Sequence, residues 1–280
     1  MSYGDIAKKP NDLLGRDFFH LAPASLSVKT KADNGITFSV NGKSSPKDGS
    51  VSGNLEAKYV DQKSGVTLTQ GWTTANLIST KFELPAFIPN LKTDVATTFV
   101  PSSGTKGANV TLNYKQSPFV SKVFVDLLKG PTFTADFAFS KAGAISGGEV
   151  SYDVPGGSVK NYAASIGYGG PSYSLFIAAA SKLTVFSAGY FVKATPAVEV
   201  AAKATWDSKS TSQVSFELGT KYTIDPSTSA KVKIANSGLV SLSYLQTIHP
   251  GVKLGLGAAV DTQRLDQAAH KLGVSFTFEA

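Results

Sequence analysis

Lysine is the residue type in this chain whose regular spacing suggests a function, the attraction of anions. Lysines occur one or two to a segment, at positions that alternate with apolar residues, so they share one face of an extended strand. A face lined with ammonium groups is expected to attract small anions weakly, because water and salt screen charges beyond about 8–10 Å. The lysines in this polar phase are Lys29, Lys31, Lys58, Lys81, Lys115, Lys122, Lys203, Lys221, Lys231, Lys233, Lys253 and Lys271, and they are interleaved with Glu56, Glu83, Asp126, Glu149, Glu199 and Glu217.

Other residue types that could form a reaction centre are too dispersed to do so. His20, His249 and His270 are the three histidines, and they lie far apart near turns or element ends. Neither a metal site nor a catalytic trio is expected from them. Carboxylates such as Asp136 and Glu149 fall in the solvated phase, where wetting of a surface is a simpler role than acid–base work. The sequence therefore predicts no catalytic residue, no metal and no enzyme.

The elements that position the lysines are strands. Between residues 213 and 260 apolar side chains recur at every second position through four segments joined by very short turns, which is typical of an antiparallel meander. The pattern extends from Ser25 to the end and predicts roughly eighteen to twenty strands of membrane-spanning length. Segments 84–92 and 117–128 keep the alternation poorly, and their boundaries stay open. The clearest apolar row is Val214, Phe216, Leu218, Tyr222, Val232, Ile234, Val240, Leu242, Tyr244, Val252, Leu254, Leu256, Ala258 and Val260.

Composition limits the class of protein. The chain has 280 residues, a net charge of +7 and no cysteine, so a disulfide framework and a thiolate metal site are excluded. It has no run of 18 apolar residues, which excludes a membrane-spanning helix; alternation halves the hydropathy of a spanning strand, so a membrane barrel stays open. The lysines are spread rather than gathered in a patch, which argues against nucleic acid as a partner.

A sheet of this size must curl, split or close. In a soluble sandwich the apolar faces would meet; in a membrane barrel they would contact lipid while the charged face lines a lumen. The charged residues keep to one of the two alternating faces of the strands, and small residues occur on the same face. Both observations favour the barrel. A soluble, basic β-rich binding protein is the alternative. The small residues are Gly219, Gly255, Gly257 and Gly273, and the aromatic residues suited to membrane interfaces are Tyr59, Trp72, Tyr168, Trp206 and Tyr222.

The first twenty residues differ from the rest. Asn11 is a favourable N-cap for a short helix that continues to about Phe19, with an opposite-charge i,i+4 pair on one side. The apolar stripe of this helix is Leu13, Leu14 and Phe18, and the charged pair is Asp12 and Arg16.

Neither common cleaved leader is predicted for this segment. A secretory signal would need a continuous apolar stretch, and mitochondrial presequences are poor in acidic residues. The segment has no such stretch and carries Asp5, Asp12 and Asp17.

Several motifs resemble those of the mitochondrial voltage-dependent anion channel family, the eukaryotic porins, and the resemblance is strongest to its fungal branch. It covers essentially the whole chain. The motifs are Asp5-Ile6-Ala7-Lys8, Leu68-Thr69-Gln70-Gly71-Trp72, Tyr222-Thr223-Ile224-Asp225-Pro226 continuing through Lys231-Val232-Lys233 to Gly238-Leu239-Val240, and His270-Lys271-Leu272-Gly273.

The resemblance implies an all-β transmembrane β-barrel. Its strand number, 19, is the family's own and is taken from the resemblance. The strands would form an antiparallel meander closed by parallel first and last strands. Residues 1–20 would form an amphipathic helix inside the pore, and residues 25–280 would form the barrel as a single domain.

The same resemblance implies a function. The family forms voltage-gated, weakly anion-selective pores of the mitochondrial outer membrane that pass ATP, ADP, NADH, phosphate and other small solutes, without a cofactor. Expected partners are the lipid bilayer, these nucleotides and small anions, further copies of the chain, and the outer-membrane import and assembly machinery. A protein-import barrel of the same superfamily is the alternative, but that should have a longer N-terminal extension and an acid-rich lumen.

Site residues are carried over from the family by position. Gln70 stands on the lipid-facing row where animal relatives have a glutamate, and Asp17-Phe18-Phe19-His20 replaces a glycine-flanked hinge, so helix mobility is not assumed. Expected pore or nucleotide contacts are Lys8, Asp12, Arg16, Lys29, Lys31, Lys58, Lys115, Lys203, Lys231 and Lys233; expected NADH contacts are Leu239, Val240, Ser241, Gly257, Ala258, Ala259, Val260 and Asp261; the expected sorting signal is Lys271, Gly273, Phe276 and Phe278.

Overall fold

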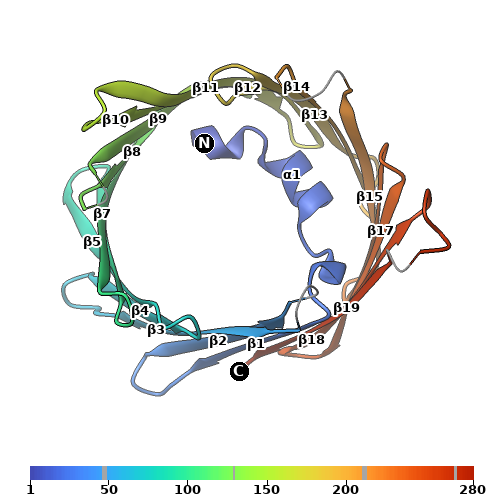
Figure 1. Ribbon diagram of the computed structural model, residues 1–280, viewed down its shortest axis with the longest axis horizontal. Coiled ribbons are helices and arrows are strands. Elements are labelled where there is room, and N and C mark those ends of the chain that lie inside the picture. Colours follow the sequence, from blue (N-terminus) through green and yellow to red (C-terminus); the bar gives the residue numbers. More distant parts are fainter. Residues whose placement is uncertain (46–48, 129, 210–212, 268–269) are drawn as a thin grey trace.

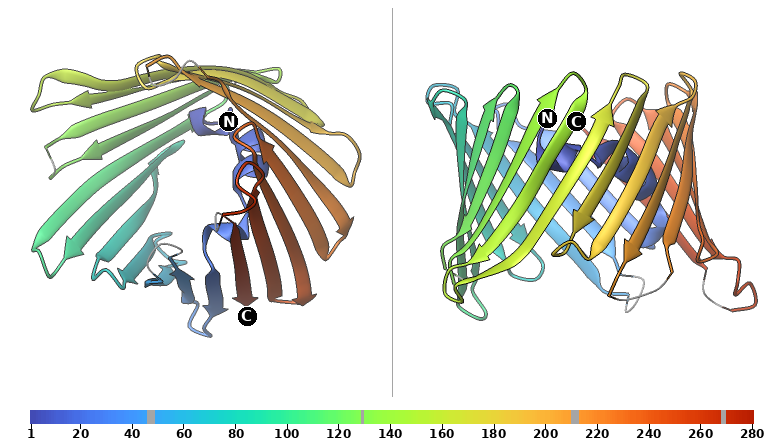
Figure 2. Two further views of the ribbon diagram at one scale, coloured as in Figure 1. Left: turned by 45° about the vertical axis from the view of Figure 1, so that its right-hand side comes forward. Right: turned by 90° about the horizontal axis from the view of Figure 1, so that it is seen from above.

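A single sheet closes on itself in the computed structural model, which describes residues 1–45, 49–128, 130–209, 213–267 and 270–280 (Figure 1). Over these residues the sheet has 19 strands, each antiparallel to the next along the chain. The strands are tilted relative to the barrel axis, as closure requires (Figure 2). Their bounds are β1 Ala24–Lys31, β2 Thr37–Ser44, β3 Val51–Val60, β4 Thr67–Thr73, β5 Ile78–Ile88, β6 Leu91–Val100, β7 Thr105–Gln116, β8 Phe119–Asp126, β9 Thr132–Lys141, β10 Ala144–Asp153, β11 Ser158–Gly169, β12 Tyr173–Ala180, β13 Val185–Lys193, β14 Val198–Asp207, β15 Ser215–Asp225, β16 Thr228–Ala235, β17 Leu239–His249, β18 Val252–Asp261 and β19 Lys271–Glu279.

The first and last strands form the one parallel pair among the described strands. Leu26 of β1 lies beside Phe276 of β19, and Val28 lies beside Phe278. Backbone hydrogen bonds continue past both ends of this pair: Val274 donates to the carbonyl of Pro23 at 3.1 Å, and Ala280 donates to the carbonyl of Lys29 at 2.9 Å. An odd number of strands in a meander makes this seam parallel, so the predicted closure is confirmed.

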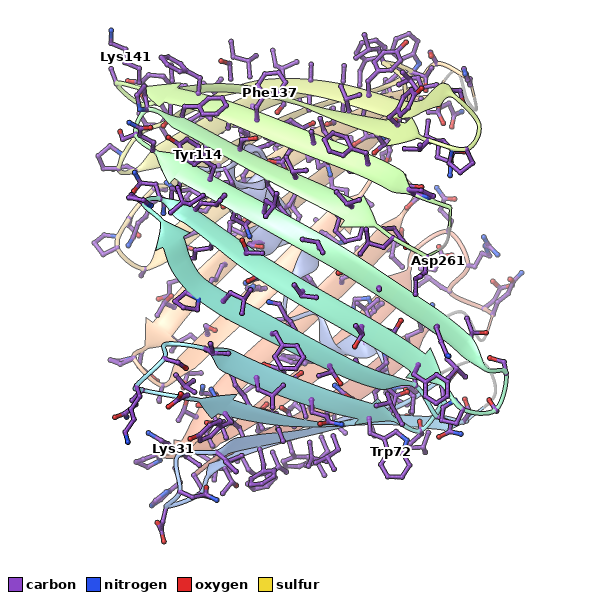
Figure 3. All side chains as sticks on the ribbon, turned by 90° about the vertical axis from the view of Figure 1, so that its left-hand side faces the viewer. Lys31, Trp72, Tyr114, Phe137, Lys141 and Asp261 are labelled. Atoms are coloured by element: carbon purple, nitrogen blue, oxygen red, sulfur yellow. The ribbon has the colours of Figure 1, made fainter. Side chains whose placement is uncertain are left out.

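The apolar rows face outward. Ile166 and Ile177 lie opposite each other on β11 and β12 and are 59% and 58% exposed. Phe137 projects from the outer face, and Trp72 lies outside the barrel toward one rim (Figure 3). In a soluble sandwich these side chains would be buried between two sheets, so that alternative is wrong. The five aromatic residues expected at the membrane interfaces are all exposed: Tyr59, Trp72, Tyr168, Trp206 and Tyr222.

The two segments whose alternation was poor are also strands. The pairing of β5 with β6 shifts register between Leu84 and Ile88, and Pro85 lies within that interval. Proline has no amide hydrogen to donate, so the ladder is interrupted there and the alternation with it. Segment 117–128 contains the turn at Ser117 and Pro118 followed by β8, whose pairing to β9 is regular.

The N-terminal segment contains η1 (Tyr3–Asp5), α1 (Lys8–Gly15) and η2 (Phe19–Leu21). The predicted helix start at Asn11 is wrong, because α1 begins at Lys8 with Ala7 as its N-cap. Pro10 is compatible with this start, since the first turn of a helix needs no intrahelical donor. The helix also ends earlier than Phe19. None of the helices in the described part of the chain is long and apolar enough to cross a membrane.

Tightly packed apolar side chains lie between this segment and the inner wall. One cluster joins Leu13 and Leu14 of α1 to Phe191 and Ala201 on β13 and β14. A second joins Ile6 to Ile145 and Phe176 on β10 and β12. The two clusters of buried apolar side chains among the described residues therefore lie inside the lumen, while the apolar rows of the strands face out.

Replacing Val110 by Lys tests the outward orientation. Val110 lies near the middle of β7 between Val95 and Val125 of the outer rows. A lysine on the lipid face near the bilayer midplane costs about 2–4 kcal/mol, so Val110→Lys should lower the free energy of unfolding from lipid vesicles by that amount. The inner-row neighbour Thr111→Lys is the matched control and should change it little. Equal destabilisation by both variants would contradict the assignment of faces.

The pore lumen and its N-terminal segment

The N-terminal segment follows the inner wall over about half of its circumference. η1 contacts β9 and β10, α1 contacts β13 to β15, and η2 contacts β17 to β19. Strands β2 to β7 face the helix from the opposite side, across open lumen (Figure 1). The passage for solutes therefore lies between α1 and this opposite wall.

Glycines on the inner rows form the surface on which the segment lies. A Cβ added to Gly219 of β15 would lie 2.7 Å from Leu14 Cδ2. One added to Gly257 of β18 would collide with the backbone of Phe19 and His20, and one on Gly273 of β19 with the carbonyl of Phe19. From the sequence alone, these glycines indicate only that the polar face lines a lumen. Their position opposite an apolar stripe at the N-terminus was the signal that could have revealed a docking surface.

Gly257→Ala should loosen the segment from the wall, because its methyl group meets backbone that cannot rotate away. The chain has no cysteine, so Ser241→Cys, at a fully buried inner position, gives a single thiol as reporter. We expect a water-soluble maleimide to label this thiol at least several-fold faster in the Gly257→Ala background. Gly42→Ala is the control, since a Cβ there meets nothing within 4 Å. Unchanged labelling in both backgrounds would refute the docking surface.

The basic groups of α1 are exposed, and their role as nucleotide contacts stays a prediction. The side chains of Lys8 and Arg16 are 55% and 68% exposed, and both reach the lumen. Each faces a carboxylate on its own segment: Lys8 Nζ lies 3.9 Å from Asp5, and Arg16 Nε lies 3.0 Å from Asp12. The apolar stripe of the predicted helix, Leu13, Leu14 and Phe18, is buried. The helix therefore offers basic groups to the lumen whose charge is partly compensated.

The predicted lysines of the wall fall into two groups. Three lie against the N-terminal segment: Lys203 donates to Asn11 at 3.0 Å, Lys231 pairs with Asp17 at 2.9 Å, and the Lys233 ammonium lies 5.2 Å from the centre of the Phe18 ring. Lys233 also pairs with Glu217 at 3.2 Å. The other group consists of Lys29, Lys31, Lys58 and Lys115, which have no ion pair within 4.0 Å among the described residues.

The residues carried over as NADH contacts divide between the two faces of the wall. The register of β17 with β18 places Val240 opposite Val260 in the outer rows, together with Ala258, so these side chains point away from the lumen. On the inner rows Ser241 and Ala259 are 0% and 1% exposed. Asp261 pairs with Arg264 at 3.4 Å. Nucleotide contact in this region stays a prediction, and the inner-row members through which it could occur are Leu239, Ser241, Gly257, Ala259 and Asp261.

The remaining carried-over residues keep the alternation. Lys271 and Gly273 belong to the inner row of β19, and Phe276 and Phe278 belong to its outer row with their rings 6.5 Å apart. Gln70 lies on the outer row of β4 beside Ala57 and is exposed. The role of the β19 residues as a sorting signal stays a prediction.

His20 is buried in the structure, which the sequence did not predict. It lies in η2, is 6% exposed, and its Nδ1 has no hydrogen-bond partner among the described residues. Burial lowers the pKa of His20 below its usual 6.5, and the positive charges of Lys233 and Lys271 lower it further. The docked state of η2 therefore favours the neutral imidazole over the charged one.

Acid should weaken the docking of η2. A group whose pKa is lowered in the docked state favours docking above its free value, and this contribution is lost progressively as the pH falls below about 6.5. A spin label on Leu21→Cys, at an exposed position of η2, should become more mobile between pH 7.5 and 5.5. With His20→Phe in the same chain the label should show no such change. A mobility that rises equally in both proteins would exclude His20 as the cause.

A closed β-sheet with an apolar outer face and a charged, water-filled lumen defines a membrane pore. The sequence profile of the eukaryotic porins matches residues 1–273, and the chain belongs to that family. It is therefore a channel protein and not an enzyme.

Curated relatives match along the whole chain. The mitochondrial outer membrane protein porin of Candida albicans is 46% identical over 280 residues, covering 100% of this chain and 99% of the relative. The protein of the same name from Neurospora crassa is 44% identical with the same coverage. Non-selective voltage-gated ion channel 1 of Saccharomyces cerevisiae is 38% identical, covering 99% and 98%. Among solved structures, a mutant of Rh. blastica porin matches with a TM-score of 0.52 at 9% identity, over 81% of this chain and 90% of that one, which is a likeness of fold alone.

Proposed function

We propose that this chain forms a voltage-gated, weakly anion-selective pore of the mitochondrial outer membrane, through which ATP, ADP, NADH, phosphate and other small solutes pass. The location and the gating follow the names of the relatives that share its whole length. The observation that supports the choice of solutes is the set of lumen lysines without ion pairs. Nucleotides would act as transported or weakly bound solutes, and no cofactor is needed for passage.

The lysines without ion pairs lie mainly on the side of the lumen that α1 leaves open. Lys31 on β1 and Lys58 on β3 flank Thr37 of β2 in one inner row. Strands are about 4.8 Å apart, so the backbones of Lys31 and Lys58, two strands apart, are separated by roughly 10 Å. Their long side chains can therefore approach one solute from both sides. Because water screens each charge over about 8 Å, these groups would bias the entry of anions without binding them tightly.

The helix offers the second set of contacts. Lys8 and Arg16 face the passage from the opposite side, although Asp5 and Asp12 compensate part of their charge. A nucleotide crossing the barrel would therefore meet exposed cations on both walls. This arrangement favours polyvalent anions over chloride in local attraction, since each phosphate charge adds to the interaction.

Other partners are also proposals. The outer rows fit a lipid bilayer. The outer face of the barrel would also be the surface for association with further copies of the chain. Lys271, Gly273, Phe276 and Phe278 would be read by the outer-membrane import and assembly machinery before the barrel closes.

Lys58→Glu should shift the selectivity of the pore toward cations. In planar bilayers with a potassium chloride gradient, we expect the wild-type reversal potential to favour chloride and the variant to move it toward the potassium potential. Lys182→Glu, in the turn between β12 and β13, is the control and should move it less. A wild-type pore that prefers cations, or equal shifts from both variants, would contradict the proposed role of the lumen lysines.

A further inference from the structure

We propose that Lys231 is a positioning residue that fixes the N-terminal helix against the barrel wall. Its partners are the Asp17 carboxylate and the Arg16 carbonyl, and Ser243 holds the Asp17 carbonyl beside them. We refer to these four residues as the clasp. The proposal concerns the placement of the helix and does not depend on which solutes pass.

The clasp lies at the point where the segment changes strands. α1 contacts β13 to β15 and η2 contacts β17 to β19, so β16 is the strand between the two contact areas. Lys231 belongs to β16. Its ammonium group donates to the Asp17 carboxylate at 2.9 Å and to the Arg16 carbonyl at 3.3 Å. On the next strand, the hydroxyl of Ser243 donates to the Asp17 carbonyl.

One of the two acceptors of Lys231, the Arg16 carbonyl, is a group that the helix end leaves unsatisfied. α1 ends at Gly15, and Arg16 is its C-cap with an extended backbone. Carbonyl groups at a helix C-terminus lack intrahelical donors and carry partial negative charge, which a cation stabilises. Lys231 supplies that cation from the wall rather than from the helix itself.

Asp17 gives the connection its direction. Its φ of 59° is in the left-handed region, which aspartate tolerates better than most residues other than glycine. This conformation turns the chain from the axis of α1 toward η2. The carboxylate of the same residue meets Lys231, so one side chain joins the turn to the wall.

Burial separates Lys231 from the lysines that face solutes. Its side chain is 8% exposed, whereas that of Lys253 on β18 is 40% exposed. An ammonium group held out of water needs its partners, because a buried charge without a counter-charge is strongly unfavourable. With the helix docked, 8% of the Lys231 side chain is left accessible to a solute in the lumen.

The test uses the full-length chain in lipid vesicles with a spin label on Gly15→Cys, where a side chain meets no other group within 4 Å. We expect Asp17→Asn and Lys231→Gln each to raise the mobility of the label at least two-fold. The exchanged pair, Asp17→Lys with Lys231→Asp, should recover a substantial part of the lost immobilisation, which a merely structural residue would not permit. Glu217→Gln is the matched control, because it breaks the neighbouring Lys233 pair on β15 and β16 without touching the clasp.

Selectivity gives an independent readout. Lys231→Gln should mobilise the helix and shift the reversal potential less than Lys58→Gln does, whereas Lys58→Gln should leave the helix label immobile. The inference is overturned if the single variants leave the label immobile, or if the control mobilises it equally. It is also overturned if Lys231→Gln shifts selectivity as much as Lys58→Gln. If Lys231→Gln does not assemble, Asp17→Asn, whose side chain is 49% exposed, decides the outcome alone.

Discussion

A strand in a bilayer must pair its backbone on both edges, because lipid offers no hydrogen bonds to an unpaired amide or carbonyl. This requirement explains why one sheet of 19 described strands closes completely and why its seam is parallel. It also explains the distribution of side chains. Once the sheet is closed, the outer face can only be apolar and the inner face can hold every charge, so alternation along each strand follows from closure.

The N-terminal segment meets a different constraint. Exposure of its apolar stripe to the water of the lumen would be unfavourable. The segment packs against the wall at Gly219, Gly257 and Gly273, where the absence of a side chain leaves room for it. The helix thus has a small hydrophobic core of its own, formed with Phe191 and Ala201. Packing of this kind fixes which part of the lumen is filled and which part stays open.

The alternation of the strands could be predicted from the sequence because it depends only on neighbouring positions. Placing Lys58 inside and Trp72 outside needs no knowledge of partners. The predicted start of α1 was wrong because Asn11 and Pro10 are both suitable near a helix start, and local preferences do not decide between the two possible starts. The strand boundaries around Pro85 could not be predicted, because the interrupted hydrogen-bond ladder also interrupts the alternation of apolar and polar residues.

Features formed between distant residues were beyond local reasoning. Lys231 and Asp17 are 214 positions apart, and nothing in either neighbourhood marks the pair. The burial of Ser241 likewise depends on what covers it. The residues carried over from the family as NADH contacts mixed both faces, because a span of consecutive residues on a strand always does, as Val240 and Ser241 show.

The parallel seam has a consequence for biogenesis. β1 pairs with β19, and Phe19 and His20 also lie on β18 and β19, so both ends of the chain depend on the strands synthesised last. Until those strands have paired, the partly assembled barrel has two open edges and its N-terminal segment lacks part of the wall against which it packs. Contacts that span nearly the whole chain form slowly. A barrel that has not yet closed therefore exposes strand edges to other chains, and the pairing of β19 with β1 both seals the wall and completes the packing of the N-terminal segment.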